Sequence, residues 1–143
     1  KSRIFDSFGD PIPMRGMAEV LEKVKSLGLE IYIVTGSGQA SLLDTLNHYF
    51  PNTFCKEKMV TAYDVKKGKP DPEPYLMALE KAGLQPSEAI VVENAPLGVR
   101  SAKGAGIFTV AVNTGILKDE DLWAAGADVV LPDMAALLTQ FLA

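Results

Sequence analysis

Cysteine and histidine are almost absent from this sequence of 143 residues, since Cys55 and His48 are the single examples of each. One cysteine cannot form an internal disulfide framework or a Cys-x-x-Cys redox pair. One residue of each type also cannot build a Cys/His zinc site. The sequence therefore predicts a protein of a reducing, intracellular environment whose chemistry depends on other side chains.

Long apolar runs and an excess of basic residues are also missing. No run approaches the roughly 18 apolar residues of a membrane span, and the first residues do not resemble a secretory signal. The formal net charge is −4, from 14 Lys and Arg against 18 Asp and Glu, which argues against a general binder of nucleic-acid backbones. With 48% hydrophobic residues, the chain is able to bury the core of one domain. We expect a cytoplasmic protein that binds neither membranes nor nucleic acid.

What the sequence does contain is a regular alternation of helix and strand patterns. An alternation of this kind predicts parallel strands joined by crossover helices, which gives an open α/β sheet with helices on both faces. Functional residues should then lie at the carboxyl ends of the strands. The predicted strands are residues 31–34, 59–65, 89–92, 107–112 and 128–131, and the predicted helices are residues 17–27, 42–50, 72–82, 97–105, 122–125 and a last helix capped by Asp133.

Two of the predicted strand ends carry groups suited to an anion. Thr35, Gly36 and Ser37 follow a strand and precede a helix, where a hydroxyl and unpaired backbone N–H groups favour negative charge. Lys69 lies before Pro70 in a stiff loop and supplies a positive charge for a phosphoryl group or a carboxylate nucleophile. Taken singly, such a turn is usually an ordinary helix cap and such a lysine is usually solvated. Their order along the chain favours a phosphate site.

A third strand end carries oxygen ligands. Glu93 and Asn94 follow the predicted strand at residues 89–92, and their carboxylate and amide oxygens suit a hard cation such as Mg²⁺. Together with the anion groups, they predict an edge of the sheet that binds both a phosphate and a metal ion.

Three strings of residues resemble the second, third and fourth motifs of the haloacid dehalogenase superfamily, in the branch of the β-phosphoglucomutase-like phosphatases. They read Ile-Val-Thr-Gly-Ser at 33–37, Gly-Lys-Pro-Asp-Pro-Glu-Pro-Tyr at 68–75 and Val-Val-Glu-Asn-Ala-Pro-Leu-Gly-Val at 91–99. The resemblance extends from about Met14 to the C-terminus. It implies a Rossmann-like, three-layer core and Mg²⁺-dependent phosphoryl transfer to small phosphate esters or sugar phosphates.

The resemblance also implies roles for single residues. Thr35, with the backbone of Gly36 and Ser37, would hold the transferring phosphate, and Lys69 would bridge this phosphate and the nucleophile. Glu93 and Asn94 would stand beside the magnesium ion, with Asn94 as the direct ligand. The family usually has a second acid at the position of Asn94, so metal affinity is expected to be weaker here. A further candidate is Gln39, one turn into the following helix, which is placed to contact the substrate's distal group.

The first motif of the family, Asp-x-Asp-Gly, supplies the nucleophile and is not found. The nearest string contains Asp6, but Phe8 stands where the second acid belongs, and residues 1–3 are too polar for a buried strand. We therefore interpret residues 1–13 as the return segment from an absent cap domain and 14–143 as an incomplete core. The chain also begins with Lys1 and not with Met. These observations predict an inactive fragment of an active parent enzyme whose nucleophile and central strand lie outside this chain.

Loss of the central strand would leave two rows of backbone groups unpaired between residues 31–34 and 89–92. Another segment, a second copy of the chain or a rearrangement would have to fill this slot, which favours self-association or strand swapping.

Other functions remain open at this point. A phosphatase, a phosphomutase and a pyrophosphatase share the residues described above, and a catalytically inert phosphate-binding scaffold would also retain them. A receiver domain likewise carries a hydroxyl, a Lys-Pro pair and carboxylates at strand ends, but there Lys-Pro follows the last of these motif strands, whereas Lys69 precedes Glu93. A dinucleotide site is suggested by Gly36-x-Gly38-x-x-Ser41, although the third glycine of that fingerprint is absent.

Overall fold

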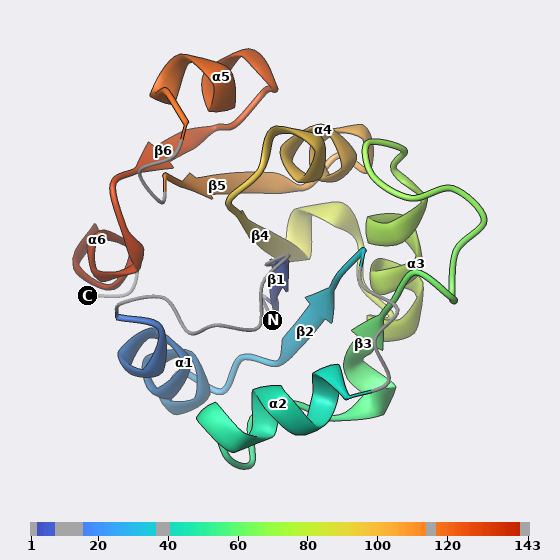
Figure 1. Ribbon diagram of the computed structural model, residues 1–143, viewed down its shortest axis with the longest axis vertical. Coiled ribbons are helices and arrows are strands. Elements are labelled where there is room, and N and C mark those ends of the chain that lie inside the picture. Colours follow the sequence, from blue (N-terminus) through green and yellow to red (C-terminus); the bar gives the residue numbers. More distant parts are fainter. Residues whose placement is uncertain (1–2, 8–15, 37–40, 114–116, 141–143) are drawn as a thin grey trace.

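Six strands form one parallel sheet in the computed structural model, which describes residues 3–7, 16–36, 41–113 and 117–140 (Figure 1). The strands are β1 (Arg3–Ser7), β2 (Ile31–Val34), β3 (Met59–Val60), β4 (Ala89–Glu93), β5 (Phe108–Val112) and β6 (Val129–Leu131). Their order across the sheet is β3-β2-β1-β4-β5-β6, and each neighbouring pair is parallel. The predicted open α/β sheet is confirmed.

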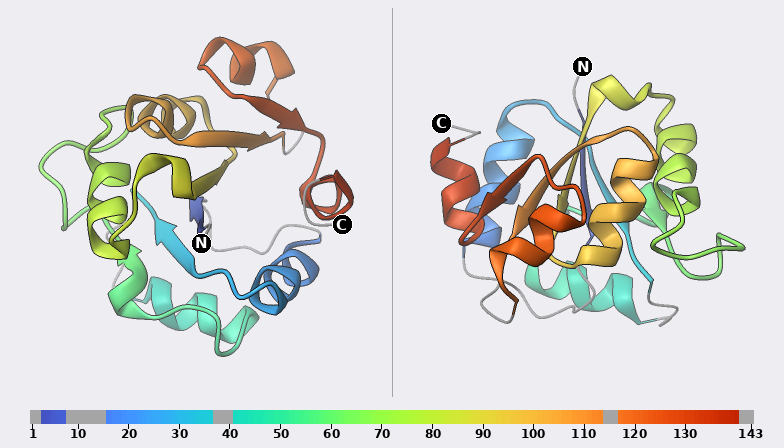
Figure 2. Two further views of the ribbon diagram at one scale, coloured as in Figure 1. Left: turned by 180° about the vertical axis from the view of Figure 1, so that it is seen from behind. Right: turned by 90° about the horizontal axis from the view of Figure 1, so that it is seen from above.

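Helices cover both faces of this sheet, as Figure 2 shows. They are α1 (Met17–Ser26), α2 (Leu42–Tyr49), α3 (Glu73–Ala82), α4 (Pro96–Gly104), α5 (Asp119–Ala124) and α6 (Met134–Gln140). Successive side chains of a strand point to opposite faces of the sheet. Ile31 and Ile33 of β2 therefore pack in one core cluster with α1, α2 and α6. Tyr32 and Val34 pack in a second cluster, on the other face, with α3 and α4. In the described part of the chain, no helix combines the length and apolar composition that crossing a membrane requires.

Local signals in the sequence fix several of the helix ends. Gly28 and Gly83 follow α1 and α3 with φ angles of 74° and 68°, a left-handed conformation that glycine adopts without steric cost. Asp133 caps α6, since its Oδ1 accepts a hydrogen bond from the backbone N–H of Ala136 at 2.8 Å. Asp71 accepts from the N–H of Glu73 at 3.0 Å, although α3 begins at Glu73, slightly later than predicted.

One predicted strand is much shorter than expected. The sequence pattern covers residues 59–65, but β3 ends at Val60 because the chain turns at Thr61. The Asp64 carboxylate accepts hydrogen bonds from the backbone N–H of Thr61 at 2.7 Å and from its hydroxyl at 3.1 Å. The backbone hydrogen bond from Thr61 outweighs partial burial and holds the pKa of the Asp64 carboxyl below its ordinary value. The turn therefore competes successfully with the extension of the strand.

The first strand corrects a prediction. We expected the central slot to lack its strand, but β1 lies between β2 and β4, with Ile4 opposite Ile31 and Ile90. The polar N-terminal residues led to the wrong expectation, because Arg3 is itself part of the strand. Pairing with β4 over residues 3–7 and with β2 over residues 4–6 satisfies backbone groups that an empty slot would expose. The interpretation of residues 1–13 as a return segment stays a prediction, and residues 8–13 lie outside the described part.

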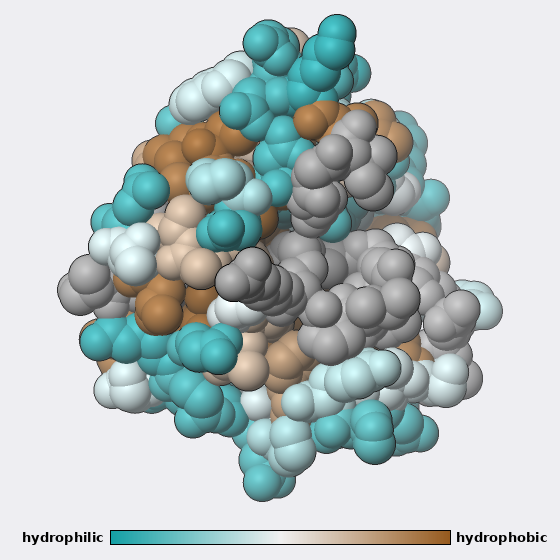
Figure 3. Space-filling model, turned by 60° about the vertical axis from the view of Figure 1, so that its left-hand side comes forward, coloured by the Kyte–Doolittle hydropathy of each residue, from teal (hydrophilic) through white to brown (hydrophobic). Residues whose placement is uncertain are grey.

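The occupied slot also removes the reason for which we expected self-association. The strand edges are now the two-residue β3 and the three-residue β6, and short edge strands offer little backbone for pairing with another copy. On the face drawn in Figure 3, hydrophobic residues are interspersed with hydrophilic ones.

Candidate active site

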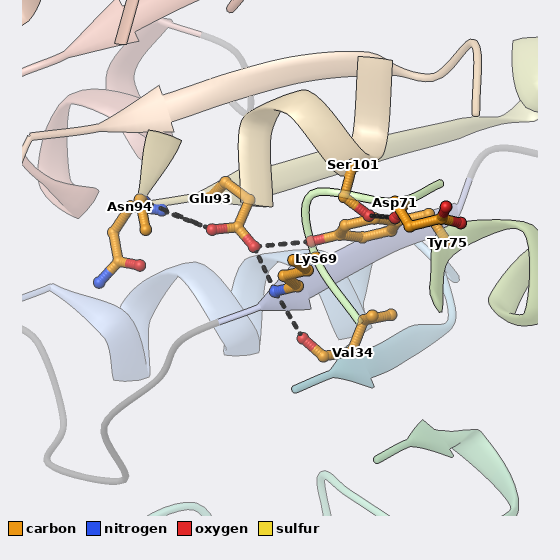
Figure 4. Close-up of polar contacts among 8 residues, drawn as sticks. Val34, Lys69, Asp71, Tyr75, Glu93, Asn94 and Ser101 are labelled. Carbon is orange, nitrogen blue, oxygen red and sulfur yellow. Dashed lines mark hydrogen bonds and ion pairs between the residues drawn. The ribbon is translucent and has the colours of Figure 1, made fainter. Parts of the chain in front are cut away.

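Residues predicted from three separate strings meet at the carboxyl edge of the sheet. Thr35 directly follows β2, Glu93 is the last residue of β4, and Lys69 lies in the loop before α3. The Lys69 Nζ is 2.6 Å from Glu93 Oε1, and it donates a hydrogen bond to the carbonyl oxygen of Val34 at 3.2 Å (Figure 4). The structure thus joins the predicted lysine to the ends of two strands that flank β1.

Glu93 is a buried carboxylate with donors on both of its oxygens. Only 1% of the residue is exposed. Its Oε1 accepts from Lys69 and from the hydroxyl of Tyr75 at 2.8 Å, and its Oε2 accepts from the backbone N–H groups of Asn94 at 3.1 Å and Ala95 at 3.4 Å. A buried charge needs an opposite charge and filled hydrogen bonds, and Glu93 has both. Its role in this arrangement is to hold Lys69 in place.

Lys69 is held on several sides. Its ammonium group lies 5.4 Å from the centre of the Tyr75 ring, within the range of a cation–π contact. The peptide bond between Lys69 and Pro70 is cis. A lysine ammonium has three donors, and within the described residues two of them have protein acceptors, the Glu93 carboxylate and the Val34 carbonyl. Within the part of the chain that the structure describes, the third donor has no protein acceptor.

The loop that carries Lys69 is fixed to α3 and α4. On one side of Lys69, the backbone N–H of Lys66 donates to the Glu73 carboxylate at 2.6 Å. On the other side, the Ser101 hydroxyl donates to the backbone oxygen of Asp71 at 2.6 Å. These bonds stabilise the loop independently of any ligand.

A pocket of about 160 Å³ opens beside these groups. Thr35 is 5% exposed, and its backbone N–H donates to the Val60 oxygen at 2.9 Å, which fixes the chain at the mouth of the pocket. The predicted phosphate residues Thr35, Gly36 and Lys69 come together here, whereas Ser37 and Gln39 lie outside the described residues. The lining residues are Thr35, Gly36, Ala62, Val65, Lys66, Gly68, Lys69 and Pro74.

Two lysines line the pocket, although the protein is acidic as a whole, with a formal charge of −4. They are Lys66 and Lys69, and no acidic residue is among the described lining residues. Positive charge at a pocket attracts anionic ligands.

The residues near the edge fit a magnesium ion that takes most of its ligands from elsewhere. No group of three or more His, Cys, Asp or Glu side chains is placed to hold a metal among the described residues. Asn94 is half-buried, and in Figure 4 its side chain extends away from the Lys69–Glu93 pair. Magnesium in phosphoryl-transfer sites is often held by one or two protein oxygens, with water and phosphate as the other ligands. The Asn94 amide oxygen is compatible with this arrangement as the one protein ligand, because both Glu93 oxygens already accept hydrogen bonds.

Two residues of this network were not identified from the sequence. Tyr75 occupies an apolar position on α3, where the sequence predicts a core residue, and it is fully buried. Gly98, in the first turn of α4, leaves room for Glu93, because an added Cβ there would overlap with the Glu93 carboxylate. Both residues lie inside the motif strings quoted above, and this is the only signal that marked them.

Comparison with known proteins identifies the family. The model of the haloacid dehalogenase-like hydrolases matches residues 5–112. The chain belongs to this family. It is 35% identical over 123 residues to validoxylamine A 7'-phosphate phosphatase of Streptomyces hygroscopicus subsp. limoneus, covering 86% of this chain and 56% of that protein. It is 36% identical over 107 residues to a phosphorylated carbohydrates phosphatase of Thermotoga maritima, covering 75% and 48% of the two chains.

Solved structures place the chain among the β-phosphoglucomutase and CbbY-like members of the family. A protein of Bacteroides vulgatus, provisionally named a β-phosphoglucomutase, is 58% identical with a TM-score of 0.80, over 85% of this chain and 49% of the other. The chain thus spans about half the length of the relatives it matches. The resemblance stated from the sequence is confirmed, and it decides against the receiver-domain and dinucleotide-binding alternatives.

Proposed function

We propose that the protein is a Mg²⁺-dependent phosphohydrolase that acts on small phosphate esters or sugar phosphates through an aspartyl-phosphate. The observation that carries this proposal is the ion pair of the half-buried Lys69 with the buried Glu93, near Thr35 at the carboxyl edge of the sheet. A fixed ammonium next to a hydroxyl and backbone N–H groups stabilises the negative charge of a transferring phosphoryl group. The phosphatases among the relatives support the same substrate class.

The reaction has two steps. A carboxylate oxygen attacks phosphorus, the bond from phosphorus to the ester oxygen breaks, and that oxygen takes a proton from solvent and leaves as the alcohol. Water then attacks phosphorus and gives up a proton to solvent, and the bond from phosphorus to the carboxylate oxygen breaks, which releases inorganic phosphate and restores the free carboxylate. Thr35, with the backbone of Gly36 and Ser37, binds the phosphoryl oxygens, Lys69 bridges one of them and the nucleophile, and Gln39 contacts the rest of the substrate.

Asn94 would hold the magnesium ion as its direct ligand, and Glu93 would stand beside the ion. When bound, the ion neutralises charge on the phosphoryl oxygens. Within the chain, the Glu93 carboxylate has the separate task of keeping Lys69 in position.

The nucleophile has two candidate sources. The absence of Asp-x-Asp-Gly favours a carboxylate outside these 143 residues, supplied by the parent enzyme together with a cap domain that precedes the return segment at 1–13. The position of β1 favours Asp6, whose backbone lies opposite Ile33 and Val92, close to the strand ends that lead into Thr35 and Glu93. The two sources predict different activities for the isolated chain.

The deciding experiment measures Mg²⁺-dependent phosphate release from an aryl phosphate. The 143-residue chain is compared with the same chain extended upstream to its natural start, each with and without Asp6→Asn. Activity in the longer form alone, unchanged by Asp6→Asn, places the nucleophile outside this chain. Activity in the short chain that Asp6→Asn abolishes assigns the role to Asp6. If neither form releases phosphate, the proposed phosphohydrolase is wrong. We refer to the form that releases phosphate as the active form.

Asn94→Asp is expected to tighten magnesium binding. The substitution replaces a neutral amide oxygen with a charged carboxylate oxygen, which hard cations prefer. The half-maximal Mg²⁺ concentration for phosphate release should fall in the active form, and Asn94→Ala should raise it. An Mg²⁺ titration that neither substitution changes would place Asn94 outside the metal's ligands.

Two other functions have specific support. The Bacteroides vulgatus structure favours a phosphomutase, in which the aspartyl-phosphate returns its phosphoryl group to a sugar phosphate. The missing Asp-x-Asp-Gly motif favours an inert phosphate-binding scaffold. A mutase would convert one sugar phosphate into its isomer faster than it releases phosphate, and a scaffold would bind phosphate without turnover. Release of phosphate from inorganic pyrophosphate would instead indicate a pyrophosphatase.

A further inference from the structure

We infer that Tyr75 is a positioning residue for Lys69 and acts through the carboxylate of Glu93. This inference rests on the proposed function, because it concerns the delivery of Lys69 to a bound phosphate. Tyr75 lies on α3, Lys69 in the preceding loop and Glu93 at the end of β4, so the contact joins three separate parts of the chain (Figure 4).

The geometry shows that Tyr75 and Lys69 share one acceptor atom. Glu93 Oε1 accepts from the Tyr75 hydroxyl at 2.8 Å and from Lys69 Nζ at 2.6 Å. Both Tyr75 and Glu93 are almost completely excluded from solvent, at 0% and 1% exposure. A hydrogen bond to a buried charged group is stronger than one between neutral groups, so this hydroxyl has a large influence on where the carboxylate lies.

The shared acceptor determines how Lys69 meets a ligand. With the hydroxyl present, Glu93 Oε1 is fixed in place and part of its negative charge is balanced by Tyr75. Lys69 is then held by Glu93 and by the Val34 carbonyl. Its third N–H has no acceptor among the described residues and is available for an anion in the pocket that Lys69 lines. Without the hydroxyl, Lys69 is the single side-chain donor to Oε1 among the described residues, so the ammonium is drawn more strongly toward Glu93 and less toward the ligand.

Packing alone does not require a tyrosine at this position. The Tyr75 ring belongs to the apolar cluster between the sheet and α3, and phenylalanine would fill the same space. A buried hydroxyl costs free energy unless it is hydrogen-bonded. Here the Tyr75 hydroxyl donates to the Glu93 carboxylate, which holds the proposed catalytic lysine. Tyr75 therefore connects the apolar cluster at α3 with the candidate active site.

The test is a double-mutant cycle on the binding of inorganic phosphate to the 143-residue chain in the presence of Mg²⁺. Tyr75→Phe removes the hydroxyl and keeps the ring. It is expected to raise the Kd for phosphate on the order of tenfold, as for a hydrogen bond to a charged group. In a chain that already carries Lys69→Ala, the same substitution should leave the Kd unchanged, because the residue that Tyr75 positions is gone.

Tyr32→Phe is the matched control, since Tyr32 is a buried tyrosine of the same apolar cluster. It should leave phosphate binding unchanged, and thermal unfolding of each variant reports any loss of structure. A purely structural role for Tyr75 predicts an equal effect in both Lys69 backgrounds, and this result would overturn the inference while the proposed function stands. Tyr75→Phe with wild-type affinity would overturn it as well. If the wild-type chain binds no phosphate and no form of the protein releases it, the proposed function fails and the inference fails with it.

Discussion

Replacing Lys69 with alanine is expected to lower the turnover of the active form by roughly 100-fold or more, the range found when one preorganised charge is removed from a transition state. The Lys69 ammonium is fixed by the Glu93 carboxylate at 2.6 Å and the Val34 carbonyl at 3.2 Å before any substrate binds. It therefore stabilises developing phosphoryl charge without having to reorganise during the reaction. The loss should appear mainly in kcat for phosphate release from an aryl phosphate.

Lys67→Ala is the matched control, because Lys67 is an exposed lysine two residues earlier in the same loop. It removes the same charge from the surface and should change turnover only slightly. Lys69→Ala also leaves Glu93 as a buried carboxylate without its cation, so the folded fraction must be measured by thermal unfolding. Turnover per folded molecule close to wild type in Lys69→Ala would remove Lys69 from the mechanism.

Much of the fold could be predicted because its signals are local. The end of α1 at Gly28 and the end of α3 at Gly83 depend on the backbone freedom of one residue, which the sequence displays directly. The buried pattern of Ile31–Val34 requires cover on both faces and is found with it. At residues 59–65 the apolar strand pattern competes with a turn that the Asp64 carboxylate stabilises through the backbone N–H of Thr61. The sequence does not show which of the two is stronger, so the predicted strand is longer than β3.

The convergence of Thr35, Lys69 and Glu93 could be predicted for a topological reason. The carboxyl ends of parallel strands share one edge of the sheet, so polar residues that follow different strands meet there. The central position of β1 was missed because strand pairing is satisfied by the backbone, and the side chains of residues 1–3 misled the prediction. A segment with an unpromising pattern still becomes a strand when it completes two neighbouring rows of backbone hydrogen bonds.

The partners of Glu93 could not be predicted. The sequence presents Glu93 and Asn94 as neighbouring oxygen groups beside a metal ion, but the structure surrounds Glu93 with four donors and leaves Asn94 half-buried. Two of these donors come from residues 69 and 75, which only the packing of α3 and its loop brings near β4. Long-range polar networks of this kind depend on distances between elements, which periodicity in a sequence does not encode.

Gly98→Ala is expected to damage the site almost as strongly as the loss of Lys69. The Glu93 carboxylate lies against the first turn of α4, where an added Cβ at Gly98 would overlap with it. The carboxylate must then move away from Lys69 and Tyr75, or α4 must shift. Overpacking of this kind costs about 1–3 kcal/mol of stability. Because Lys69 would lose its fixed partner, turnover of the active form should fall on the order of 100-fold, as for removal of a preorganised charge.

Gly104→Ala separates this effect from a general change in the helix. Gly104 ends the same helix, and a Cβ there would meet the side chain of Pro72 at 3.1 Å and not the Glu93 carboxylate. Both substitutions add the same methyl group to α4 and favour the helical conformation to a similar degree. Thermal unfolding and phosphate release are measured for both variants. If Gly98→Ala and Gly104→Ala lose the same activity, the position of Glu93 does not govern catalysis; if only Gly98→Ala loses it, the carboxylate controls the lysine as its hydrogen bonds indicate.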